Sequence, residues 1–122
     1  MITEDYVSFE TAKLLKEKGF NEKCSRWYVA NEPQEGIIEK GFGENQFYIN
    51  APTLQMAMKW LREVHNCNIE IDTIGQKSLD TLSWRSVIYN IEHDMECYYE
   101  DNFKSYEEAC EAAIKYCLEN LI

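Results

Sequence analysis

The stretch PTLQMAMKWLREVHNCNIEID, residues 52–72, decides the fold class of this chain. Its first part predicts a helix that Thr53 can cap, because apolar residues recur at helical spacing. That stripe consists of Leu54, Ala57, Met58, Leu61 and His65. Residues 68–72 then alternate strictly between polar and apolar side chains, as a strand with one solvent-facing side does. A helix that leads directly into such a strand predicts a mixed fold.

Downstream of this stretch, residues 84–91 predict a second strand, and residues 95–99 extend or bulge the same sheet. The side chains of the second strand divide between two faces, which are Arg85, Val87, Tyr89, Ile91 and Trp84, Ser86, Ile88, Asn90. Ser105 and Glu108 then form a capping box, which predicts that a last helix begins there. Its inner stripe contains small Ala and Cys residues, which should let the helix approach a sheet closely.

Upstream, Ser8 can cap a helix over residues 9–18, and Gly19 can end it. Residues 26–30 and 46–49 predict an antiparallel strand pair, with Ile37 and Ile38 as a short strand between them. With 122 residues, the chain has the usual size of one domain. We therefore predict one α+β domain over residues 1–122, with about three helices packed on one face of a mostly antiparallel sheet of about four strands.

The charge balance excludes several classes of partner. The 12 Lys and Arg residues face 22 Asp and Glu residues, which gives a net charge of -10 and opposes binding to nucleic acids and anionic lipids. The acidic start has no apolar signal segment, and the uncharged runs are too short to span a bilayer. The five cysteines are odd in number and form no CxxC pair, which favours a reducing compartment. We expect a cytoplasmic protein that binds neither nucleic acid nor membrane.

Motifs for catalysis and cofactor binding are missing. The chain lacks GxSxG, GxxxxGK[ST], GxGxxG and the calcium-loop pattern. His65 with Cys67 and His93 with Cys97 are candidate zinc ligands or cysteine–histidine dyads, but neither pair has the usual zinc-knuckle spacing. The alternative is that His65 favours a helix C-terminus and that the cysteines are small core residues. We assign no cofactor, metal or catalytic residue.

The negative charge is concentrated at the C-terminal end. Residues 51–91 carry no net charge, whereas residues 92–122 carry 9 acidic and 2 basic side chains. This segment is either a solubilising surface or a face for a basic partner, which could include imitation of DNA phosphates. The candidate binding face combines these acids with neighbouring aromatic residues: Glu92, Asp94, Glu96, Tyr98, Tyr99, Glu100, Asp101 and Trp84.

Two function classes follow from these observations. The leading hypothesis is a non-catalytic protein-interaction module that binds an unknown, basic protein partner through this face. The alternative is a small enzyme or ligand-binding protein that uses an aromatic-lined recess with a carboxylate or a histidine. Homodimerisation through the apolar C-terminus, formed by Leu118, Leu121 and Ile122, stays open.

Four segments of the chain resemble a known family. They are DYVSFE (residues 5–10), AKLL (residues 12–15), PTLQMAMKWLRE (residues 52–63) and SYEEACEAAIKY (residues 105–116). Together they are similar to small uncharacterised proteins of prophages and mobile elements in gut anaerobic bacteria. The resemblance implies a bacterial or phage origin and a stand-alone domain. It implies no catalytic or binding residues.

Overall fold

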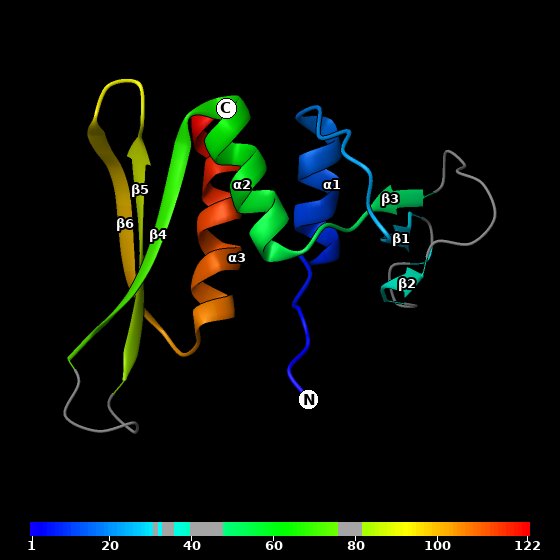
Figure 1. Ribbon diagram of the computed structural model, residues 1–122, viewed down its shortest axis with the longest axis horizontal. Coiled ribbons are helices and arrows are strands. Elements are labelled where there is room, and N and C mark those ends of the chain that lie inside the picture. The colour runs from blue at the N-terminus through cyan, green and yellow to red at the C-terminus, as the bar shows by residue number, and fades with distance from the viewer. Residues whose placement is uncertain (31, 33–35, 40–47, 76–81) are drawn as a thin grey trace. The chain divides into compact units, whose positions relative to one another are not determined.

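The structure is a computed structural model that describes residues 1–30, 32, 36–39, 48–75 and 82–122 (Figure 1). The chain forms two compact units, which we call the N-terminal unit (Met1–Ala57) and the C-terminal unit (Met58–Ile122) and describe separately. The elements in chain order are α1 (Phe9–Glu17), β1 (Arg26–Val29), β2 (Ile38–Glu39), β3 (Tyr48–Asn50), α2 (Leu54–His65), β4 (Cys67–Ile74), β5 (Ser83–Asn90), β6 (Met95–Phe103), α3 (Tyr106–Tyr116) and the π-helical turn η3 (Cys117–Leu121).

The N-terminal unit contains α1 and an antiparallel sheet in the order β2-β1-β3. Ser8 caps α1 by accepting a hydrogen bond from the backbone N–H of Thr11 at 3.3 Å, and Gly19 follows the helix with a φ of 94°. Both features confirm the predicted helix start and stop. The predicted pairing of β1 with β3 is also confirmed, although residues 46 and 47 of the predicted strand lie outside the described residues.

Helix α2 has the apolar stripe that the sequence predicts. Thr53 caps it, since its Oγ1 accepts a hydrogen bond from the backbone N–H of Met56 at 3.1 Å. Ala57 and Leu61 are fully buried. Asn66, with a φ of 58°, turns the chain from α2 into β4, and its carbonyl accepts a hydrogen bond from the backbone N–H of Ile91 at 2.8 Å.

The C-terminal unit is an antiparallel sheet in the order β4-β5-β6, against which α3 packs. Ser105 caps α3 by accepting from the backbone N–H of Glu108 at 3.1 Å, and the Glu108 carboxylate accepts from the backbone N–H of Lys104 at 3.3 Å. The predicted capping chemistry is therefore present, with the glutamate reaching one residue further back than Ser105. The small residues Ala109, Cys110 and Ala113 are buried, which lets α3 approach the sheet closely.

The α+β class is confirmed, with three α-helices and antiparallel strands in the described part of the chain. The strand arrangement differs from the prediction, because two sheets of three strands replace one sheet of about four. Strand β6 also runs past the predicted residues 95–99 to Phe103, although Glu100, Asp101 and Asn102 have low strand propensity. Glu100 pairs with Ser86 and Phe103 pairs with Trp84, and the register shifts between these two pairs. Asp101 and Asn102 form the resulting bulge, in which Asn102 has a φ of 70°. The expectation of one domain over residues 1–122 stays a prediction.

Candidate functional site

All eight predicted binding residues lie on the hairpin of β5 and β6 in the C-terminal unit. Trp84 belongs to β5, whereas Glu92 and Asp94 lie in the turn over residues 91–94. The other five, Glu96, Tyr98, Tyr99, Glu100 and Asp101, belong to β6. Successive side chains of a strand point to opposite faces of a sheet, so these residues divide between two surfaces.

One surface, which we call the covered face, packs against α3 (Figure 1). At its centre, Ile88 is fully buried and Ser86 is 1% exposed. The Tyr98 ring stacks on the Tyr116 ring of α3, with 3.7 Å between centroids and 8° between planes. Two of the predicted binding aromatics thus hold α3 in place, because Trp84 also meets an aromatic ring of that helix, edge to face at 5.7 Å.

The opposite surface of the same sheet, which we call the open face, has none of the described helices of the C-terminal unit packed on it. The register sets Tyr99 opposite Val87, and sets Tyr89 opposite Glu96. The Tyr99 side chain is 55% exposed, whereas Val87 beside it is 6% exposed. This face therefore presents tyrosines around a sheltered valine.

An ion pair crosses two strands of the open face. Arg85 donates from Nε to Asp72 Oδ1 at 2.9 Å and from Nη2 to Asp72 Oδ2 at 2.6 Å, so the carboxylate is bound in a two-pronged arrangement. These hydrogen bonds lower the pKa of Asp72 and raise the pKa of Arg85. The electrostatic influence of Tyr89 and Tyr99 also raises the pKa of Arg85, to a lesser extent.

The open face includes residues that are not among the predicted binding residues. Asp72, Arg85 and Tyr89 belong to this face but not to the predicted binding residues, although the alternation over residues 84–91 sets Arg85, Val87 and Tyr89 on one side. The alternation does not tell which of the two sides is covered by α3. The contacts of Trp84 and Tyr98 with aromatic rings of α3 identify the covered side, and these are contacts between segments far apart in the sequence.

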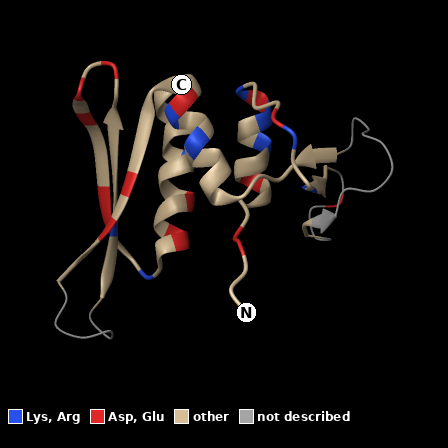
Figure 2. Ribbon diagram, in the orientation of Figure 1, with Lys and Arg blue, Asp and Glu red and all other residues tan. Residues whose placement is uncertain are grey.

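Acidic residues follow the hairpin turn, β6 and β4 (Figure 2). Glu92, Asp94 and Glu96 are exposed, and the backbone N–H of His93 donates to Asn90 Oδ1 at 3.0 Å within the turn. Glu100, also exposed, pairs in register with Ser86 and so belongs to the side of Tyr98. Desolvation raises the pKa of Tyr98, and the charge of Glu100 adds to this effect. The negative charge therefore surrounds the sheet and is not confined to the open face.

The candidate zinc ligands form no metal site in the described residues, where no group of three or more His, Cys, Asp or Glu side chains could hold a metal ion. Cys67 and Cys117 instead share a hydrogen bond between their thiols. Cys97 donates to the backbone carbonyl of Met95 at 3.7 Å. The His65 ring meets Trp60 edge to face at 4.7 Å.

All five cysteines are free thiols, and three of them are buried. Burial raises the pKa of the Cys110 thiol to about 11 and raises the pKa values of Cys67 and Cys117. A nucleophilic cysteine needs a lowered pKa, so these three have the properties of core residues.

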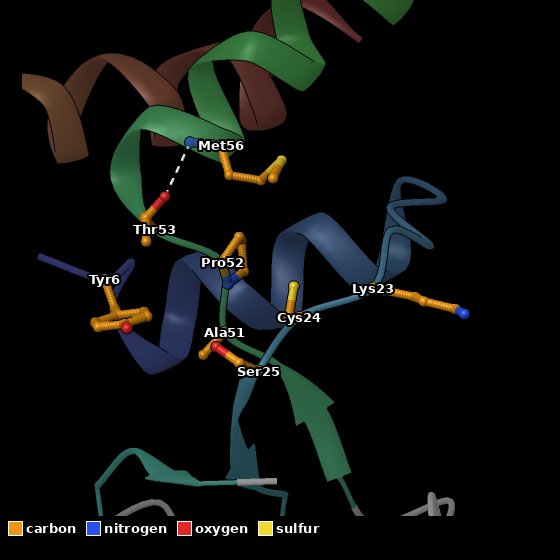
Figure 3. Close-up of a pocket in the computed structure, with 8 residues that line it drawn as sticks. All are labelled: Tyr6, Lys23, Cys24, Ser25, Ala51, Pro52, Thr53 and Met56. Atoms are coloured by element: carbon orange, nitrogen blue, oxygen red, sulfur yellow. Dashed lines mark hydrogen bonds between the residues drawn. The ribbon is translucent and has the colours of Figure 1, made fainter. Parts of the chain in front are cut away.

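Described residues of the N-terminal unit line two small cavities. The first, shown in Figure 3, has a volume of about 120 Å³ and is lined by Tyr6, Lys23, Cys24, Ser25, Ala51, Pro52, Thr53 and Met56. The second has a volume of about 110 Å³ and is lined by Ala12, Lys16, Phe20, Asn21, Tyr48 and Asn50. Typical ligand pockets have volumes of roughly 300–1,000 Å³. Neither cavity is lined by the carboxylate or histidine that the enzyme alternative requires. In Figure 3 the Lys23 side chain points away from the other residues that line the first cavity.

The apolar C-terminus, considered above for homodimerisation, is partly used within the C-terminal unit. Leu118 is fully buried, and Leu121 and Ile122 are half-buried.

No helix in the described part of the chain is long and apolar enough to span a membrane. Comparison of the chain with protein-family models, curated proteins and solved structures finds no match. The function must therefore be inferred from the surfaces of the chain itself.

Proposed function

We propose that this chain is a small acidic, non-catalytic protein-interaction module that binds a partner protein through the open face of the β4-β5-β6 sheet. The observation that carries this proposal is the exposure of Tyr99 beside Tyr89 and a paired Arg85, on a sheet face that no described helix of its unit covers. Tyrosine and arginine are enriched among residues that dominate binding energy at protein interfaces.

The neighbouring turn enlarges this surface. Ile91 is 47% exposed and Met95 is 56% exposed, at the end of the hairpin where Glu92 and Asp94 are also exposed. A surface that combines apolar and aromatic side chains with a charged rim has the anatomy of a protein interface. The free thiols fit a reducing compartment, so we place the interaction in the cytoplasm. An origin in a prophage or mobile element is part of the same proposal.

A site-specific photo-crosslinking experiment tests the function. One variant carries benzoylphenylalanine in place of Tyr99 on the open face, and a matched control carries it in place of the exposed Glu107 on α3. Both are irradiated in a lysate of the organism that encodes the chain. We expect a discrete crosslinked protein from position 99 that is absent from position 107. The same set of products from both positions, or no protein product from position 99, overturns the proposal.

A further inference from the structure

The two faces of the β4-β5-β6 sheet differ in their cover, although they belong to the same three strands. On one side α3 packs against all three strands. Strands in a sheet lie about 4.8 Å apart, so the outer strands of this sheet are about 10 Å apart. An α-helix with its side chains is roughly 10–12 Å in diameter. One helix is therefore wide enough to cover the open face, just as α3 contacts all three strands on the other side.

The side chains of the open face combine tyrosines with carboxylates around the sheltered Val87. In register, one row across the sheet contains Glu70, Val87 and Tyr99. The next row contains Asn68, Tyr89 and Glu96, and Asp72 with Arg85 continues the face on the other side. Glu70 on β4 and Glu96 on β6 thus flank the sheltered valine, and the exposed tyrosine lies on the same edge strand as Glu96.

The charge of this face points to the charge of its partner. Arg85 is the only Lys or Arg in the three strands, and Asp72 already neutralises it through two hydrogen bonds. Glu70 and Glu96 are exposed acids of the same face. A second copy of the chain, docked face to face, would place like charges against each other, which is unfavourable at an interface. A cationic partner is complementary.

We propose that the open face binds an amphipathic helix of a partner protein, with an apolar stripe flanked by Lys and Arg residues. This inference rests on the proposed function and names the partner's recognition element. The apolar stripe covers the exposed Tyr99 ring, and the flanking cations reach Glu70 and Glu96.

A synthetic peptide tests this proposal directly. The probe is a fluorescein-labelled helix of about 18 residues, roughly 27 Å long, with leucines at i, i+3, i+4 and i+7 spacing and lysines elsewhere. The control peptide has the same composition in scrambled order. Binding to the full chain is measured by fluorescence anisotropy, and the binding surface is mapped by NMR chemical shifts. We expect the patterned peptide to bind at least about tenfold more tightly, with shifts centred on Val87 and Tyr99.

Two pairs of charge variants locate the interaction. E70Q/E96Q removes two carboxylates from the open face, whereas E107Q/E119Q removes two exposed carboxylates from α3 and η3, and both pairs change the net charge equally. We expect the first pair to weaken binding several-fold and to reduce its salt dependence, and the second pair to bind like the unmodified chain. Tyr99→Ser should weaken binding about tenfold.

Several outcomes would overturn the inference. Equal affinity for the patterned and scrambled peptides means that only net charge is recognised. Equal weakening by both charge pairs places the peptide elsewhere. The photo-crosslinking experiment separates this failure from failure of the proposed function. If position 99 captures a protein through a strand or loop, the interaction module stands and the helix proposal falls. If position 99 captures nothing, both proposals fall.

Discussion

The covered and open faces of the β4-β5-β6 sheet share the same three strands but use their side chains differently. The covered face buries Ile88 and Ser86 and stacks Tyr98 on a ring of α3. The open face exposes Tyr99 and an arginine–aspartate pair. Burial of apolar surface stabilises the fold, whereas exposed ion pairs contribute little. Stability therefore explains the composition of the covered face but not the composition of the open face, which is why we assign recognition to the latter.

The largest contrast should appear in stability. Ile88→Ala removes a fully buried side chain from the covered face and leaves a cavity, so we expect the free energy of unfolding to fall by about 3 kcal/mol. Tyr99→Ser alters the open face, where substitutions change stability by less than about 0.5 kcal/mol. Urea denaturation followed by circular dichroism measures both values. Similar losses for the two variants would show that the two faces are equally buried in solution.

A second contrast concerns the thiols. At pH 7.5 a disulfide reagent such as Ellman's reagent should label the half-buried Cys24 and Cys97 first. Cys67, Cys110 and Cys117 lie in the interior, and the pKa of about 11 for Cys110 leaves roughly one thiolate in three thousand at that pH. We expect two fast thiols in the folded protein and five in guanidinium chloride. Fast reaction of a third thiol in the folded protein would contradict the packing of α3.

Local sequence patterns predicted the helices and most of the strands. Capping residues such as Ser8 and Ser105 act on backbone groups a few residues away, so a short window of sequence contains the whole signal. The end of β6 was not predictable in this way. Glu100 is a poor strand former, and its place in β6 depends on pairing with Ser86 of β5, which is a contact between separate segments.

The candidate site also has features that the sequence predicts and features that depend on contacts between distant segments. The charge sums predict that acids gather in residues 92–122, because charge is a property of composition, and these residues include α3 and η3 as well as the hairpin turn and β6. The sequence did not separate Tyr98 from Tyr99, although the first stacks on α3 and the second is 55% exposed. Adjacent residues of a strand always point to opposite faces. Which face is covered depends on where a distant helix packs.

The smallest effect concerns the ion pair of the open face. The hydrogen bonds from Arg85 lower the pKa of Asp72 below its ordinary value of 3.8. A lowered pKa in the folded state contributes stability above the pKa of the unfolded chain, and this contribution disappears as the pH falls through the folded-state pKa. Both side chains are exposed, with 34% and 51% of their surfaces accessible, so solvent screens the pair and the change in stability should be small.

The pKa itself is the better readout of this pair. An NMR titration of the Asp72 carboxyl carbon should give a lowered value in the unmodified chain, and Arg85→Gln should return it toward the ordinary range. High salt should raise the pKa of Asp72 in the unmodified chain and change it less in the variant. A pKa that is the same in both proteins would mean that the pair is open in solution. In that case Arg85 would be available to a partner, and the charge complementarity of the open face would have to be revised toward a less basic ligand.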